Sequence, residues 1–334
     1  MAKCNLPISS KPHYSYSQMV DLLKSRGMII SDRDRAKRKL SQIGYYRLSG
    51  FWFPCREVKK DSLGKGLLHP GTKFPIREDN FQDSVDFNQI VSLYLFDKKL
   101  RLLMIDAIER VEIHIRSVIA HEMGYHDPLA YQKDSFINPN KMCTYEDKST
   151  KRIRNLWMEW RSKQQILILR SQEDCIKWHR IAKKPIPFWV AVESWDFGTL
   201  SKYYSMLRGK YQRKISMRLG VSNEKVVENW LHEINILRNR CAHHSRIWNQ
   251  STNNPLSVLD IPYFNKLSLD KRSRKRIFGM ICILWFLVKK LGPSSDWLKS
   301  ISSLINSKPS IECCPYTAMG FLDNNGFPDL DLFC

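Results

Sequence analysis

The chain has 334 residues, of which 43% are apolar and 11% aromatic, so it is a folded globular protein with a sizeable core and not a disordered basic tail. Its 54 lysines and arginines outnumber its 33 acidic residues, which gives a formal net charge of +21. Such a surplus repels itself in a compact fold. It therefore indicates a polyanionic partner, with nucleic acid ahead of an anionic membrane.

Three features argue against a membrane or secreted protein. The longest apolar run, residues 277–288, is well short of the roughly 20 residues that span a bilayer. The opening stretch MAKCNLPISSKPHYSYSQ lacks the apolar core of a secretory signal. The nine cysteines are scattered without a CxxC pair, and the adjacent Cys313 and Cys314 are expected to be unlinked thiols. We therefore expect a cytoplasmic protein with reduced cysteines and no membrane partner.

Residues 1–86 are predicted to form a small helical module with a connecting loop. Ser15 can cap a first helix over YSQMVDLLKSR, which Gly27 ends. Ser31 with Asp34 resembles a capping box for a second helix. The aromatic segment YYRLSGFWFP follows, and a polar loop with little periodicity completes the module.

The second part, residues 87–301, is predicted to be a helical bundle. From Phe87 onward, apolar residues recur at three- and four-residue steps, and Gly124 is the expected end of the first long helix. A basic, tryptophan-rich helical segment follows, and a later helix begins at the cap Ser222. The side chains expected to form the buried face of that helix are Val226, Val227, Trp230, Leu231, Ile234 and Leu237. Residues 302–334 are expected to pack on the bundle as a tail. Since strand signals are few, the fold class is mainly α.

One stretch near the end of a predicted helix, ILRNRCAHHSRIWN at residues 236–249, carries groups suited to catalysis. Read as helical through His244, it places Asn239 and His243 on one face, where the amide can orient the imidazole. The guanidinium of Arg238 can donate two hydrogen bonds to a phosphate, and a histidine can move a proton near neutral pH. These residue types are the parts of a ribonuclease site that uses no metal.

Spacing alone leaves that interpretation open. An arginine five residues ahead of a histidine arises readily by chance in a basic chain, and a second pair, Arg116 and His121, lies in the long predicted helix. Basic residues at a helix end also complement the helix dipole without any function. No cysteine and histidine set has the ligand spacing of a zinc site, so neither a metal nor a cofactor is predicted.

Two basic segments are candidate RNA-binding surfaces. One lies in the N-terminal module, and the other is the tryptophan-rich segment, where an exposed ring could stack on a base. The alternative is that the tryptophans belong to the core and the charges are merely solvated. The residues expected to contact RNA are Arg33, Arg35, Lys37, Arg38 and Lys39 in the first segment, and Arg152, Arg154, Arg161, Lys183 and Lys184 in the second.

Four blocks of the sequence, in this order, resemble the Abi-like family of bacterial abortive-infection proteins of the AbiD/AbiF type, whose C-terminal part belongs to the HEPN superfamily. The blocks are KPHYSYSQMVDLLKSRGMIISDRDRAKRKLSQIGYYRLSGFWFP, LYLFDKKLRLLMIDAIERVEIHIRS, PFWVAVESWDFGTLSKYY and LRNRCAHHSRIWN. The resemblance covers nearly the whole chain. It implies a HEPN-type helical bundle that carries the small N-terminal helical module.

The resemblance also implies a set of catalytic residues. The HEPN ribonuclease signature is an arginine, usually a polar residue after it, and a histidine a few residues on; Arg238, Asn239 and His243 match it. The implied reaction is metal-independent RNA cleavage that leaves a 2′,3′-cyclic phosphate. Residues with an implied supporting role are Arg240, His244 and Arg246.

HEPN active sites are generally built from two motifs that face each other. The resemblance therefore implies a homodimer with both Arg238 and His243 pairs at a shared cleft. The alternative is a pairing within one chain, in which Arg116 and His121 supply the second half-site. We favour the dimer, because Arg116 and His121 lack a neighbouring asparagine.

The function implied by the resemblance is a toxin-like RNA endonuclease of phage defence, restrained in healthy cells by a non-coding RNA or a protein antitoxin. The alternative is a non-catalytic RNA-binding protein, part of a ribonucleoprotein. A third class, a membrane-acting effector, is disfavoured by the absence of a long apolar segment.

Overall fold

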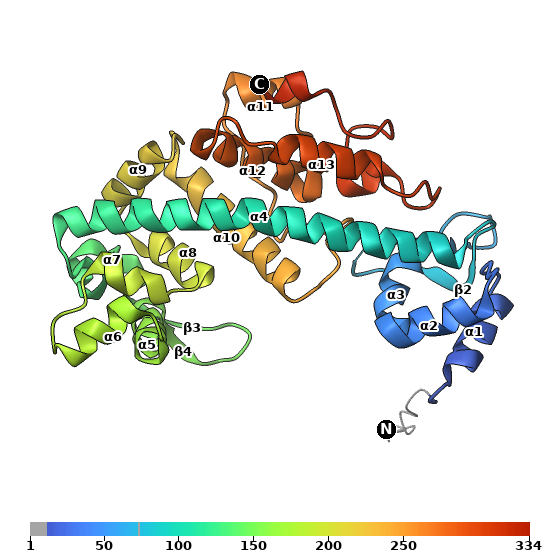
Figure 1. Ribbon diagram of the computed structural model, residues 1–334, viewed down its shortest axis with the longest axis horizontal. Coiled ribbons are helices and arrows are strands. Elements are labelled where there is room, and N and C mark those ends of the chain that lie inside the picture. Colours follow the sequence, from blue (N-terminus) through green and yellow to red (C-terminus); the bar gives the residue numbers. More distant parts are fainter. Residues whose placement is uncertain (1–11, 73) are drawn as a thin grey trace. The chain divides into compact units, whose positions relative to one another are not determined.

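The computed structural model describes residues 12–72 and 74–334, and its α-helices dominate as predicted (Figure 1). The segment before residue 12, most of the stretch examined for a secretory signal, lies outside the described residues. The chain divides into two compact units. The first comprises Met1–Lys98 with Ser307–Pro315, and the second comprises Lys99–Asn306 with Tyr316–Cys334.

From residue 12 onward, the described part of the first unit contains three helices, a two-stranded antiparallel sheet and the start of a long helix. The β-hairpin pairs Arg56 with Phe81, and it lies where the sequence predicts only a polar loop. The elements are α1 (Tyr16–Ser25), α2 (Arg33–Ile43), α3 (Tyr45–Trp52), the 3-10 turn η1 (Phe53–Cys55), β1 (Arg56–Val58), β2 (Arg77–Phe81) and the first turns of α4 (Phe87–His126).

Of the two capping boxes predicted in this unit, the structure confirms the one at Ser15 and contradicts the one at Ser31. Ser15 Oγ accepts a hydrogen bond from the backbone N–H of Gln18 at 3.3 Å, and the Gln18 side chain accepts one from the Ser15 N–H at 2.8 Å. The capping box predicted for Ser31 and Asp34 is wrong. The cap of α2 is Asp32, whose short carboxylate accepts from the N–H of Arg35 at 2.8 Å.

The expectation of reduced, unlinked cysteines is wrong for Cys55 and Cys313. A disulfide joins Cys55, the last residue of η1, to Cys313 in the returning segment 307–315. The two residues are 258 positions apart in sequence. Sequence spacing gives no sign of this pairing, because it depends on the C-terminal segment folding back into the first unit.

The second unit holds the rest of α4 and nine further α-helices (Figure 1). The basic tryptophan-rich segment forms two helices, α5 and α6. The elements after α4 are β3 (Thr144–Glu146), β4 (Ile153–Asn155), α5 (Leu156–Arg170), α6 (Asp174–Ile181), α7 (Phe188–Ala191), α8 (Phe197–Met206), α9 (Gly209–Arg218), α10 (Glu224–Ala242), α11 (Pro262–Leu267), α12 (Ile277–Leu291) and α13 (Trp297–Asn306), with short 3-10 turns between some of them.

Helix α4 starts at Phe87, as predicted, but it continues through Gly124 to His126. A Cβ atom at position 124 would lie 3.1 Å from Cε3 of Trp189. This glycine therefore permits close packing of the tryptophan ring on the helix and does not end it.

The core of the second unit is rich in aromatic side chains. Trp160, Trp195 and Tyr203 are almost fully buried, and their ring centroids lie between 5.0 and 5.5 Å apart. Residues 277–288 of α12 are all buried, so its long apolar run belongs to the protein interior. Over the ranges that the structure describes, no helix combines the length and the apolarity needed to cross a bilayer.

Candidate functional site

Helix α10 carries the predicted motif at its C-terminal end, and its apolar face anchors it in the second unit. The six residues expected to form its buried face are all buried. The cap at its start is Asn223 and not Ser222, because the Asn223 side chain accepts from the N–H of Lys225 at 2.9 Å. These six residues are Val226, Val227, Trp230, Leu231, Ile234 and Leu237.

The helix ends earlier than the sequence predicts. Its last helical residue is Ala242, His243 is the C-cap, and His244 has a left-handed backbone with φ 57°. The N–H of Ser245 donates to the carbonyl of Arg240 at 2.8 Å, and the N–H of His244 donates to that of Cys241 at 3.1 Å. This pair of bonds is a Schellman C-cap. His244 therefore leaves the helix and does not stack over Arg240.

The same cap closes α1, α6 and α9. In α1 and α9 the left-handed position is filled by Gly27 and Gly220, while α6 has Lys183 there with φ 50°. A left-handed backbone brings the Cβ atom of any residue other than glycine too close to the next carbonyl. A histidine at this position of α10 therefore carries a local cost that a glycine would not.

We expect the substitution His244→Gly to raise the free energy of unfolding by up to about 1 kcal/mol, because it relieves the left-handed strain. The matched control is Lys183→Gly, which relieves the equivalent strain in α6 outside the motif. Urea denaturation of both variants checks the stability, and a loss of stability in His244→Gly would contradict the expectation.

Three residues of the motif lie together at this helix end. Arg238 is partly buried, and its Nη1 donates to Oδ1 of Asn239 at 3.4 Å. The N–H of His243 donates to the carbonyl of Asn239 at 2.9 Å, while the exposed His243 ring makes no hydrogen bond within residues 12–72 and 74–334. The Asn239 amide therefore contacts the arginine, and the histidine ring is open to a ligand.

A carboxylate from α4 completes the electrostatic surroundings of Arg238. Burial raises the pKa of Glu112, and the nearby guanidinium groups of Arg116 and Arg238 partly oppose that rise. Glu112 is thus close enough to Arg238 for their charges to interact. Sequence reasoning missed this residue, because only the packing of α4 near α10 brings it to the motif.

The second arginine and histidine pair is engaged in contacts within the protein. The Arg116 guanidinium donates to Glu112 at 3.0 Å, to Glu193 at 3.3 Å and to the carbonyl of Trp195 at 3.1 Å. The His121 ring lies 2.9 Å from Nη1 of Arg218. Because these contacts occupy both side chains, a phosphate at Arg116 would have to replace two acidic partners.

The supporting arginines of the motif are tied to the loop that follows it. Arg240 Nη1 donates to the carbonyl of Ser251 at 2.7 Å. Arg246 is partly buried, and the Gln250 side-chain oxygen lies 2.6 and 3.2 Å from two of its guanidinium nitrogens when the amide is oriented toward it. The Arg240 contact holds the following loop to α10, and the Arg246 contact lies within that loop.

The two predicted RNA-binding surfaces differ in how their charges are paired. On α2, Arg33 forms an ion pair with Asp21, and Lys37 forms one with Asp34 at 3.1 Å. Arg35 and Arg38 are exposed. Lys39 donates to Gln42 at 3.3 Å.

In the second surface, Arg154 pairs with Glu159 at 2.5 Å, and the guanidinium of Arg161 lies 5.7 Å from the centre of the Trp157 ring. Arg152 and Lys183 are exposed, and Nζ of Lys184 lies 4.8 Å from the centre of the Trp178 ring.

The tryptophans of that segment separate into two groups. Trp157 and Trp160 are 2% and 3% exposed and stack on each other in the core, so they have no face for a base. Trp178 is 54% exposed beside Lys184. Among these three rings, only Trp178 can serve the predicted stacking on RNA.

Comparison with known proteins confirms the Abi-like family named above. Residues 38–249 match the family model described as Abi-like protein. The match ends at Asn249, so it includes the whole motif at the end of α10. No curated protein and no solved structure matches the chain.

Proposed function

The chain belongs to the family of Abi-like proteins, and from this premise we propose that it is a HEPN-type RNA endonuclease that acts in abortive infection. The observation that carries the proposal is the arrangement at the end of α10. Arg238 and Asn239 lie in the last turns of the helix, and the outward-facing His243 is its C-cap residue. The net charge of +21 supports a polyanionic substrate.

The proposed reaction is attack of a ribose 2′-hydroxyl on the adjacent phosphorus. A new bond forms between the 2′-oxygen and phosphorus, and the bond to the 5′-oxygen of the next nucleotide breaks. His243 moves a proton from the attacking hydroxyl or to the leaving oxygen. Arg238 stabilises the charge that develops on the phosphate. The products are a 2′,3′-cyclic phosphate and a 5′-hydroxyl end.

Incubation of the purified protein with total RNA in the presence of EDTA tests this function. We expect cleavage, with cyclic phosphate at the new 3′ ends. Cleavage that disappears with EDTA would overturn the metal-independent reaction. Tight binding of RNA without cleavage, also in a phage-infected lysate, would favour the non-catalytic RNA-binding alternative.

We propose that the second half-site comes from another copy of the chain. The structural support is that Arg116 and His121 are engaged by Glu112, Glu193 and Arg218, whereas the His243 ring faces outward. Light scattering coupled to gel filtration should therefore give twice the chain mass of 39.4 kDa. A strictly monomeric protein that still cleaves RNA would exclude the dimeric site.

A nuclease of this kind has to be restrained in healthy cells. We propose a non-coding RNA as the restraint, since a chain of charge +21 favours a polyanion over a basic protein. Exposed Arg35, Arg38, Arg152 and Lys183, with Trp178 beside Lys184, are the proposed contacts. Protein purified from its host should carry RNA, and the absence of bound RNA would favour a protein antitoxin.

A further inference from the structure

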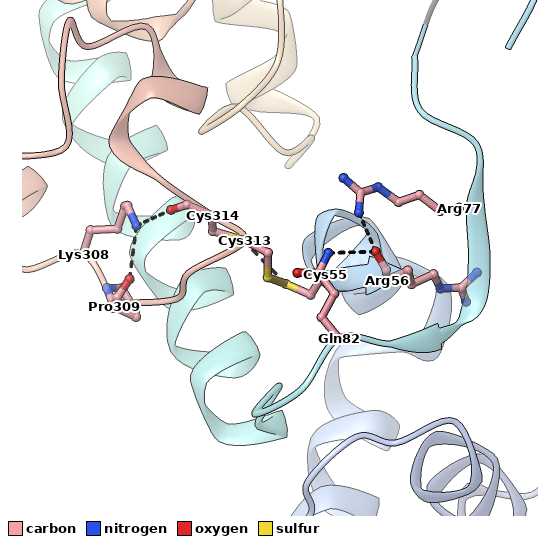
Figure 2. Close-up of a disulfide and its surroundings, with 8 residues drawn as sticks. All are labelled: Cys55, Arg56, Arg77, Gln82, Lys308, Pro309, Cys313 and Cys314. Carbon is pink, nitrogen blue, oxygen red and sulfur yellow. Dashed lines mark hydrogen bonds between the residues drawn. A yellow bond between two sulfur atoms is a disulfide. The ribbon is translucent and has the colours of Figure 1, made fainter. Parts of the chain in front are cut away.

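Three cysteine sulfur atoms meet in the interior of the first unit (Figure 2). Cys55 and Cys313 form the disulfide, with Cα atoms 5.2 Å apart, and the Sγ atom of Cys314 lies 3.7 Å from that of Cys55. Cys55 and Cys314 are fully buried. The cluster therefore contains one disulfide and a third thiol within reach of it.

The neighbours of the third thiol are cationic. Lys308 is 7% exposed, and its ammonium donates to the carbonyl oxygens of Cys314 at 2.7 Å and Pro309 at 3.1 Å (Figure 2). Burial lowers the pKa of Lys308 and that of Arg77, and a negative charge on Cys314 opposes both shifts. Two cations are thus placed to stabilise the thiolate, which is the nucleophilic form of cysteine.

We propose that Cys55, Cys313 and Cys314 form a thiol–disulfide exchange site that connects segment 307–315 to the end of α3 and η1. In the exchange, the Cys314 thiolate attacks Sγ of Cys55. The Cys55–Cys314 bond forms, the Cys55–Cys313 bond breaks, and Cys313 leaves as a thiolate that takes up the proton lost by Cys314. The step conserves one disulfide and one thiol, and it requires no external oxidant.

A dithiol reductant would complete the cycle. Its two thiols become a disulfide, while Cys55 and its partner cysteine gain two protons and two electrons, so segment 307–315 loses its covalent link. In a reducing compartment, such disulfides are transient and typically sense or transfer redox equivalents. The site would make the attachment of this segment depend on the redox state.

A metal site fits the same residues less well. Tetrahedral zinc held by thiolates requires sulfur atoms about 3.8 Å apart. The distance between Cys55 and Cys314 meets that requirement, but Cys55 and Cys313 are bonded. Within the part of the chain that the structure describes, no histidine or carboxylate joins the three sulfurs as a fourth ligand.

Disulfide mapping by mass spectrometry tests the exchange. Full-length protein is purified without reductant, quenched in acid, alkylated with N-ethylmaleimide and digested. In the wild type we expect two populations, one linking Cys55 to Cys313 and one linking it to Cys314, each with the other cysteine alkylated. Cys313→Ser should retain the link from Cys55 to Cys314, and Cys314→Ser should retain only the link to Cys313.

Three results would overturn the proposal. The first is alkylation of the same one cysteine in every wild-type molecule, and the second is loss of the link to Cys314 in Cys313→Ser. The third is stoichiometric zinc in the purified protein with no disulfide at Cys55. The control is Cys143→Ser, an exposed thiol of the second unit whose loss should leave the pattern unchanged.

Amide hydrogen exchange is a second measurement, and it tests directly whether the disulfide holds segment 307–315 in place. Dithiothreitol should increase amide hydrogen exchange across residues 307–315 in the wild type. In Cys55→Ser, exchange there should be fast with or without the reductant. Unchanged exchange in the reduced wild type would mean that the disulfide does not hold the segment, which would overturn the redox-dependent attachment.

Discussion

Replacing His243 by alanine should reduce the cleavage of total RNA in EDTA by roughly 10²–10⁴-fold, the usual contribution of a positioned general acid or base. The physical reason is that the imidazole is the group proposed to move the proton of the 2′-hydroxyl or of the leaving oxygen. The ring is exposed at the C-cap of α10 and carries no structural hydrogen bond within residues 12–72 and 74–334. Its loss should therefore leave folding intact.

His232→Ala is the matched control, because His232 is an exposed histidine on the same helix, about three turns before His243. It should cleave like the wild type. If His243→Ala also cleaved normally, His243 would have no catalytic role. If both histidine variants lost activity equally, the effect would reflect the helix and not the imidazole.

Two substitutions of Arg238, tested in the same assay, separate the effect of its positive charge from that of its planar guanidinium group. Arg238→Ala should lose about 10²–10³-fold in cleavage, as expected when a donor to the developing charge is removed. Arg238→Lys keeps the charge but not the planar fork, so we expect an intermediate loss. A lysine variant as active as the wild type would show that the positive charge alone is sufficient.

The sequence predicts those parts of the fold that local patterns determine. The start of α4 at Phe87, the capping box at Ser15 and the buried face of α10 all depend on spacing within one helix, and the structure confirms them. Gly124 shows where that reasoning fails. Many helices end at a glycine, but this glycine lies inside α4, where it leaves space for the ring of Trp189.

The surroundings of the candidate site depend on tertiary contacts and were beyond the reach of the sequence. Glu112 lies far from the motif in sequence, and only the packing of α4 near α10 places it close to Arg238. The left-handed backbone of His244 could not be predicted either, because the sequence has no glycine at that position to indicate a helix cap. The Arg116 contacts likewise require α4 to meet residues 193–195.

The loop that follows the motif is held by one buried carboxylate on α10. Glu233 is 1% exposed, and its oxygens accept the backbone N–H groups of Asn253 and Asn254, each at 2.9 Å. The Asn254 side chain donates to the same carboxylate at 2.9 Å. Arg240 also contacts Ser251. The loop after His243 is therefore bonded to α10 at two residues, Glu233 and Arg240.

Glu233→Ala should therefore lower the free energy of unfolding by about 1–3 kcal/mol, because it removes three hydrogen bonds to a buried carboxylate. Glu228→Ala is the matched control on the same helix. Glu228 pairs with Lys225 at 2.9 Å on the surface, and its loss should change stability by at most about 0.5 kcal/mol. Urea denaturation measures both variants, and equal midpoints with equal slopes would contradict the role of Glu233.

The same variant also tests how the end of α10 that carries the candidate site depends on its loop. Glu233 lies on the buried face of the helix and does not reach the surface where His243 is exposed. Folded Glu233→Ala should thus still cleave RNA in the cold, and it should lose activity on warming at a lower temperature than Glu228→Ala. A variant as stable as the wild type but inactive in the cold would instead place Glu233 in the reaction.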